Sequence, residues 1–203
     1  MTTHANGRTA HYPIDPMFLE RWSPRAFDGE GISEELLMTL FEAARWAPSA
    51  FNAQPARFLY ARRGTPSWSK FLGLLIPFNQ SWAERASALV AIVSQMTVIK
   101  PGAEPTPNYS HSFDAGAAWA YLALQASRLG LHVHGMTGFD HARAPVELNV
   151  PTDHRVEAMI AIGRLGDKSL LPEGLQAREA PNDRKPLSAL AFEGGFPDTR
   201  VDK

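Results

Sequence analysis

The sequence contains no cysteine. Its absence excludes disulfide bonds, thiolate nucleophiles, iron–sulfur clusters and zinc sites with cysteine ligands. Neither sign of charge is in excess, because 20 Lys and Arg stand against 21 Asp and Glu, whereas a nucleic-acid-binding protein usually carries a basic excess or a basic run. The longest apolar run, around residues 89–93, is far shorter than the roughly 20 residues that cross a bilayer. No nucleic acid or membrane partner is therefore expected.

The N-terminal segment also lacks an apolar stretch, since residues 1–11 are polar and show no secretory signal. We therefore expect a cytoplasmic location. The 203 residues, 44% hydrophobic and 20% charged, have the composition of one globular domain. Residues 1–12 and the Pro-, Gly- and charge-rich residues 167–203 show little periodicity, so we expect them to form arms on that domain.

Helical and strand-like patterns alternate between the arms. We expect helices near residues 15–22, 33–48, 66–75, 79–85 and 114–128 and after 140, with strands over 58–61, 88–94, 132–137 and 156–164. This order predicts an α+β fold with helices packed on a mixed or antiparallel sheet. Residues 96–110 contain three prolines and are expected to form a long loop, of the kind that often serves as a lid or contacts a partner.

Two segments could bind an anion and a flat ligand. Arg21 and Arg25 flank Ser23 at a helix-to-loop junction, where two guanidinium groups and a hydroxyl can surround a phosphate. Taken alone, this pattern more often marks solvated surface arginines. Residues 47–55 follow a helix and carry small residues with Asn52 and Gln54, whose amides suit the edge of a pyrimidine-like ring. Taken alone, that segment is more typical of an ordinary turn.

A third segment, residues 134–140, places two glycines at a strand end, where backbone N–H groups can face a ligand. The alternative is a glycine turn before a helix capped by Asp140. His132 and His134 lie on one side of the expected strand, but no third ligand stands at a diagnostic spacing, so no metal site is predicted. The nucleophile-elbow, P-loop and dinucleotide-binding motifs are missing, and no side chain is predicted to act as a nucleophile or acid–base pair.

Taken in order, these segments resemble the FMN-dependent nitroreductase family. The matching pieces are Arg-x-Ser-x-Arg at 21–25 followed by Ala-Phe-Asp, E-A-A-R-W-A-P-S-x-x-N-x-Q-P at 42–55, Leu-Gly-Leu at 129–131 leading to Gly-Phe-Asp at 138–140, Ala-Ile-Gly at 161–163, and Arg-Lys-Pro at 184–186. The block at 42–55 is highly specific, and the others gain weight from their order and spacing. The resemblance covers most of residues 15–190 and implies a central sheet flanked by helices in an intertwined homodimer, with two FMN sites at the interface.

The resemblance also implies which residues bind FMN. Phosphate and ribityl contacts are implied for Arg21, Ser23 and Arg25, with Arg184 and Lys185 as late phosphate contacts; Trp22 stands where relatives often have a basic residue. The other implied cofactor contacts are Pro48, Ser49, Ala50, Asn52 and Gln54 from the partner subunit, Asn79 at the pyrimidine edge, and Gly135, Met136, Thr137 and Gly138 at N5 and O4. Some relatives carry a Lys where this chain has Trp82. Phe51, Trp82 and residues 96–110 are our guesses for the acceptor site.

The implied activity is hydride transfer from NADH or NADPH through the flavin N5 to a nitroaromatic, quinone or related small acceptor, by a ping-pong cycle. FMN then carries the chemistry, and the protein supplies binding, orientation and electrostatics. Two alternatives remain open: a specialised flavin enzyme of the same fold (a dehydrogenase, a dehalogenase-like reductase or a flavin-consuming enzyme), or a non-catalytic flavin-binding protein.

Overall fold

The computed structural model describes residues 3–99 and 102–197. Its helices are α1 (Met17–Glu20), α2 (Glu34–Arg45), α3 (Trp68–Gly73), α4 (Pro77–Ala83), α5 (His111–Arg128), α6 (Arg143–Glu147) and α7 (Glu173–Gln176). Its strands are β1 (His4–Ala5), β2 (Arg8–Thr9), β3 (Ala56–Arg62), β4 (Ala88–Gln95), β5 (Thr97–Val98), β6 (Thr106–Pro107), β7 (His132–Met136) and β8 (His154–Gly163). Short 3-10 turns lie at Ala50–Asn52, Lys168–Leu170 and Leu187–Ala189. No helix in the described ranges is long and apolar enough to cross a membrane.

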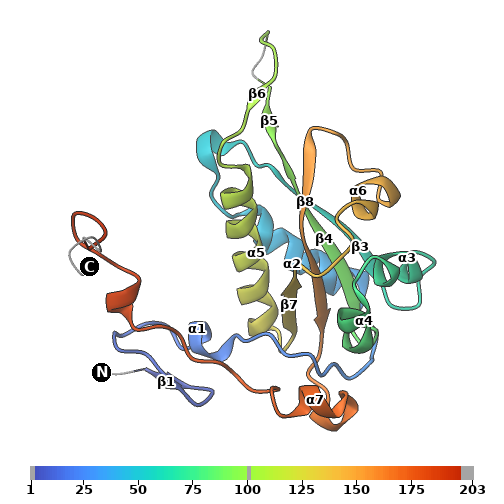
Figure 1. Cartoon of the computed structure of the whole chain (residues 1–203), viewed down its shortest axis with the longest axis vertical. Coiled ribbons are helices and arrows are strands. Elements are labelled where there is room, and N and C mark those ends of the chain that lie inside the picture. The colour runs from blue at the N-terminus through green and yellow to red at the C-terminus, as the bar shows by residue number, and fades with distance from the viewer. Residues whose placement is uncertain (1–2, 100–101, 198–203) are drawn as a thin grey trace, which may run out of the picture.

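A four-stranded sheet in the order β3-β4-β8-β7 forms the centre of the α+β fold (Figure 1). Each neighbouring pair is antiparallel, so the choice between a mixed and an antiparallel sheet is settled for the described residues. The predicted strands are confirmed with slightly different ends. Strand β4 is buried from Ala88 to Ser94, as its continuous apolar run predicts.

Alternate residues of β4 serve two separate cores, because successive side chains of a strand point to opposite faces. Ala88, Val90 and Ile92 pack with α2 and α5 on one face. Leu89, Ala91 and Val93 lie in the core that also contains residues of α3, α4 and α6. The sheet is therefore covered by helices on both faces.

The helix starts follow the capping signals in the sequence. The Ser33 side chain accepts a hydrogen bond from the Leu36 N–H and begins α2. Asp15 accepts from the Met17 N–H before α1. Asp140 accepts from the Ala142 and Arg143 N–H groups before α6. Helix α5 begins at His111, three residues before the predicted start.

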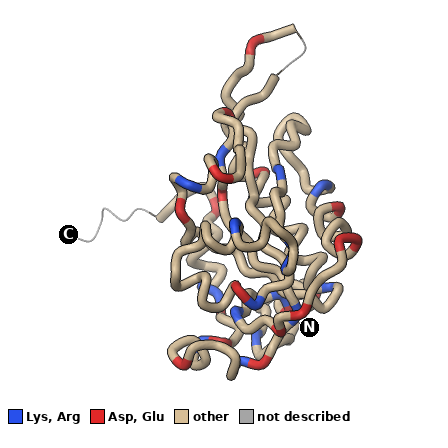
Figure 2. The backbone as a smooth tube through the Cα atoms, turned by 90° about the vertical axis from the view of Figure 1, so that its right-hand side faces the viewer, with Lys and Arg blue, Asp and Glu red and all other residues tan. Residues whose placement is uncertain are grey.

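Residues 96–110 are not the plain loop that the sequence predicted. Strands β5 and β6 pair through Thr97↔Pro107 and Val98↔Thr106 and form a hairpin that projects beyond the body of the molecule (Figure 2). Residues 100–101 lie outside the described residues. Threonine and valine are favoured in strands, and this preference outweighs the loop signal from the surrounding prolines.

The sheet contains one irregularity that matters below. The β4–β8 ladder passes from Ile92↔Ala158 directly to Val93↔Val156. Glu157 is therefore an extra residue on β8, which makes a β-bulge. Bulges turn the local strand and change where a side chain points.

Candidate functional site

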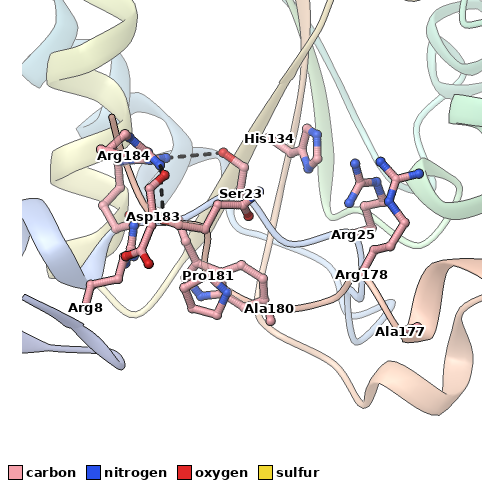
Figure 3. Close-up of a pocket in the computed structure, with 13 residues that line it drawn as sticks. Arg8, Ser23, Arg25, His134, Ala177, Arg178, Ala180, Pro181, Asp183 and Arg184 are labelled. Carbon is pink, nitrogen blue, oxygen red and sulfur yellow. Dashed lines mark hydrogen bonds between the residues drawn. The ribbon is translucent and has the colours of Figure 1, made fainter. Parts of the chain in front are cut away.

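A cavity of about 700 Å³ opens between the N-terminal residues, the segment after α1 and the C-terminal arm (Figure 3). It is lined by Arg8, Arg21, Trp22, Ser23, Arg25, His134, Ala177, Arg178, Ala180, Pro181, Asn182, Asp183 and Arg184. Five of these residues are arginines and one is an aspartate. We call this the arginine cavity.

Three parts of the chain hold the arginines together. Arg8 lies on β2, and its Nη2 donates to the Arg21 carbonyl at 3.1 Å. Arg21 Nη1 donates to Ser23 Oγ at 3.2 Å. Arg184 lies in the C-terminal arm, where its Nη1 donates to the Asn182 and Asp183 carbonyls at 3.1 and 3.0 Å. These contacts use only a few of the five N–H donors that each guanidinium group carries.

The arginine cavity has the electrostatics of an anion site. Burial and the nearby Arg184 lower the pKa of Arg8, and burial, Arg184 and Arg8 lower the pKa of Arg21. Among the described residues, the Nε groups of Arg8 and Arg25 are buried without a hydrogen-bond partner. A buried donor without a partner costs free energy, so an anion with several acceptor oxygens would relieve both penalties.

The buried carboxylate of Glu179 joins the arm to the segment after α1. Its Oε1 accepts from the Arg25 and Ala26 N–H groups at 2.6 and 2.8 Å, and Oε2 lies 4.0 Å from Arg25 Nη1. Its carboxylate therefore fixes the backbone that carries Arg25.

A second cavity, of about 310 Å³, shares Ser23 with the first. It is lined by Ser23, Ile92, Ser112, Ala115, Gly116, Trp119, Gly135, Met136, Thr137, Glu157, Ala158 and Ile160. We call it the ring cavity. Gly116 leaves space on one side of it, because a Cβ there would meet no atom within 4 Å, whereas Gly135 allows the close approach of Trp119, which a Cβ would meet at 3.3 Å.

His134 lies in the wall of the arginine cavity. Burial lowers its pKa, so the imidazole is neutral at pH 7, and its Nδ1 lies 2.9 Å from the Pro24 carbonyl. That contact requires Nδ1 to carry the proton. The described residues hold no group of three or more His, Asp or Glu arranged for a metal.

Several residues proposed from the sequence lie outside both cavities. Pro48, Ser49 and Gln54 line a separate hollow of about 460 Å³ with α2 and β3. Phe51, Asn52 and Gln54 adopt left-handed backbone angles, with φ of 52°, 55° and 48°, which are strained for residues other than glycine. The Ala50 N–H donates to Asp114 at 3.2 Å, which ties the segment to α5.

Asn79, Gly138 and Lys185 also lie apart from the two cavities. Asn79 is buried, and its Nδ2 donates to the Gly138 carbonyl at 2.9 Å. A Cβ on Gly138 would lie 2.6 Å from Asn79 Nδ2, so this position requires glycine. Asn79 therefore fixes the turn that follows β7. Lys185 lines a neighbouring groove beside the N-terminal residues.

The guess that Trp82 lines an acceptor site is wrong. Only 1% of Trp82 is exposed, and its ring packs 4.7 Å from His134 and 6.3 Å from Phe27 between centroids. Phe51, by contrast, is fully exposed. Trp82 belongs to the core because it lies on the inner face of α4, which its short helical segment does not reveal.

Among the lining residues that the sequence reasoning missed, four are charged or aromatic and matter most to the chemistry of the cavities. Arg8 and Arg178 lie in segments without periodicity, and no local signal distinguishes them from surface arginines. Trp119 and Glu157 point into the ring cavity from α5 and the β8 bulge. Gly116 in the same helix was a visible sequence signal for Trp119. Nothing in the sequence marks the bulge that carries Glu157.

Comparison with known proteins agrees with this architecture. The nitroreductase family model matches residues 19–65. A relative from Leptothrix cholodnii, whose name assigns it provisionally as an NADH dehydrogenase or NAD(P)H nitroreductase, is 30% identical over 193 residues, covering 87% of this chain and 93% of the relative. The chain belongs to the nitroreductase family. The sequence resemblance is thereby confirmed.

Solved structures extend the match. This nitroreductase-family chain superposes on a protein described as an oxidoreductase containing FMN with a TM-score of 0.94 and 50% identity, over 96% of this chain and 98% of the other. A nitroreductase-like FMN complex from Exiguobacterium sibiricum matches with a TM-score of 0.71 and 22% identity, over 87% and 95% of the two chains, and supports the fold alone. Membership of this family makes the chain an oxidoreductase.

Proposed function

We propose that the protein is an FMN-dependent oxidoreductase that passes a hydride from NADH or NADPH to a small acceptor such as a nitroaromatic or a quinone. The observation that carries this proposal is the pair of neighbouring cavities that have Ser23 as a common wall residue, one cationic and one uncharged over most of its wall. A phosphate at one end and a flat ring at the other match their chemistry. The solved protein that is 50% identical to this chain and is described as an oxidoreductase containing FMN supports the same assignment.

The described residues fit FMN. Arg8, Arg21, Arg25 and Arg184 would hold the phosphate, and the unpartnered Nε groups of Arg8 and Arg25 supply donors that the fold itself leaves unused. The open side of Gly116 leaves room for a flat ring beside α5. Arg178 adds positive charge at the cavity wall.

Bound FMN would supply reversible hydride transfer at N5. The protein's own residues would bind and orient: the 135–138 turn, fixed by Asn79, presents backbone groups beside the ring cavity, and Glu179 holds the backbone of Arg25. His134 remains neutral and adds no charge to the cavity wall. No side-chain nucleophile is needed.

We propose further that the 203 residues form one domain with two arms, and that two copies make the complete site. Pro48, Ser49, Ala50, Asn52 and Gln54 line no part of the two cavities within their own chain. They would cover the FMN of the other subunit. The strained backbone at 51–54 is consistent with a functional segment, because strain collects at such sites.

The experiment begins with the purified protein. Release of FMN in a one-to-one ratio, anaerobic bleaching by NADH or NADPH, and recolouring by a quinone or nitroaromatic are expected. Initial rates should give parallel double-reciprocal lines, since one site serves donor and acceptor in turn. Converging lines would show that both substrates bind together. A yellow protein inert to both nicotinamides would favour flavin binding without this activity.

A further inference from the structure

Glu157 enters the ring cavity because of the β-bulge in β8. In a regular ladder its side chain would alternate with those of Val156 and Ala158. As the extra residue of the bulge, it lines the cavity together with its neighbour Ala158. A charged residue in an otherwise uncharged wall needs an explanation.

Three elements hold the Glu157 carboxylate in place. Ser94 on β4 and Ser112 on α5 both donate their hydroxyls to Oε1. Arg155 on β8 donates to both oxygens, with Nη2 2.9 Å from Oε2. His111 Nδ1 lies 2.8 Å from Ser94 Oγ and 3.4 Å from Glu157 Oε1. The carboxylate is therefore fixed rather than free to turn into solvent.

This set of donors keeps Glu157 ionised. Burial raises its pKa, but the hydrogen bonds from Arg155, Ser94 and Ser112 outweigh burial and leave the pKa below its ordinary value. A carboxylic acid that ionises so readily is a poor proton donor near pH 7. Its contribution to the cavity is a negative charge.

The two groups nearest the cavity carry opposite charges but differ in exposure. Both lone pairs of Oε2 are taken by Arg155, whose Nε and Nη2 donate at 3.2 and 2.9 Å, so the carboxylate acts on a ligand through its charge. The Arg155 side chain is 53% exposed, so water screens its positive charge more than that of the buried carboxylate. A molecule in the cavity would meet the carboxylate, because Glu157 lines the wall and Arg155 does not.

We infer that Glu157 is a specificity-determining residue: its negative charge in the wall of the ring cavity favours neutral or cationic acceptors over anionic acceptors of the same shape when they stack on the flavin ring placed there. This inference rests on the proposed function. Like charges brought together out of water repel strongly, and specificity often comes from such a repulsive element.

The test uses the FMN-loaded protein and three matched acceptors: 4-nitrobenzoate, 4-nitrobenzyl alcohol and 4-nitrobenzylamine. The wild type is expected to prefer the alcohol and the amine in kcat/KM. Glu157→Gln should shift the alcohol-to-benzoate ratio about tenfold toward the anion, because it removes the charge and frees Arg155. Titration of benzoate and benzyl alcohol, followed by the flavin absorbance, should show the same shift in Kd without turnover.

A second variant has the opposite expected sign. Arg155→Gln removes the positive charge that partly neutralises the Glu157 carboxylate, and it should move the alcohol-to-benzoate ratio of kcat/KM several-fold away from the anion. Arg155 is half exposed, so we expect this variant to fold. The control is Glu147→Gln, which removes a carboxylate paired with Arg143 at 2.7 Å on α6, away from both cavities. Its ratio should equal that of the wild type.

Opposite shifts in the two variants support the inference. Unchanged ratios, or shifts in the same direction, overturn it, and Arg155→Gln decides alone if Glu157→Gln fails to fold in thermal unfolding. Failure of the proposed function has a different signature, because the wild type would then hold no FMN or reduce none of the three acceptors.

Discussion

At the scale of single residues, the arginine cavity depends on side chains that meet only in the fold. Arg8 and Arg184 come from opposite ends of the chain, yet they lie close enough that burial and the charge of Arg184 lower the pKa of Arg8. Bringing cations together without an anion is unfavourable. Their grouping therefore points to a ligand that carries negative charge.

Replacing one of these arginines should weaken FMN binding. Charge-assisted hydrogen bonds contribute roughly 1.5–3 kcal/mol each, so Arg8→Ala or Arg184→Ala should raise the Kd of FMN about tenfold to a hundredfold. Fluorescence titration of the apoprotein measures this change. Arg143→Ala, on the surface of α6, is the control and should bind FMN like the wild type; equal affinity in all three variants would contradict the phosphate assignment.

The two histidines of β7 make stability depend on pH. Burial lowers the pKa of His132 and of His134, so below the ordinary value of about 6.5 the unfolded chain binds protons that the folded chain does not. The free energy of unfolding should then fall as pH falls from about 6.5 toward the folded-state pKa values of the two histidines. Above pH 6.5 the contribution of these histidines to the free energy of unfolding should be constant.

Urea unfolding between pH 5 and 8 tests that dependence. His134→Asn keeps a donor for the Pro24 carbonyl but cannot be protonated, so its stability should vary less with pH in this range. An unchanged slope in the variant would show that His134 is not the source.

At the scale of elements, helix α5 both packs against the sheet and lines the ring cavity. Its buried residues, including Ala115, Ala118 and Leu122, pack on the sheet, while Gly116 opens onto the ring cavity. Glycine within a helix costs roughly 0.5–1 kcal/mol relative to alanine. That cost has a functional reason if the missing side chain makes room for a ligand.

Two substitutions of Gly116 should separate these effects. Gly116→Ala should raise the Tm of the apoprotein by about 2–4 °C, because the new Cβ meets no atom within 4 Å. Gly116→Leu should fill the cavity and weaken FMN binding at least tenfold. Calorimetry and FMN titration measure both, with Gly73→Leu on α3 as a matched helical glycine that should leave FMN binding unchanged.

At the scale of the whole molecule, the arms expose apolar side chains that a water-soluble surface would not favour. Tyr12, Ile14, Phe18, Leu187 and Leu190 line a groove of about 710 Å³ between the two arms. The C-terminal arm runs past the N-terminal segment and away from the sheet (Figure 1). Exposed apolar surface on this scale marks an interface, which agrees with the proposed dimer.

Ending the chain at Pro186 should therefore release FMN although every arginine of the cavity remains. The shortened protein would lose apolar contacts with a second copy, and a ligand that binds only the assembled state stabilises it by mass action. Sedimentation velocity, with absorbance in the flavin band, should show a yellow dimer for the wild type and a smaller, paler species for the variant. A monomeric wild type with stoichiometric FMN would refute the dimer.

The sequence by itself determined the four central strands, most of the helices that cover them and the family. The Ser33 cap, the buried run of β4 and the specific block at 42–55 are local signals, which neighbouring residues fix regardless of the rest of the chain. Arg21, Ser23 and Arg25 could be found for the same reason. Tertiary structure alone decided that Arg8 and Arg178 join them, that Trp82 is buried and that Asn79 braces the Gly138 turn. It also placed Glu157 in the ring cavity, because a bulge arises from the pairing of β4 with β8, and pairing between distant segments leaves no mark in either segment alone.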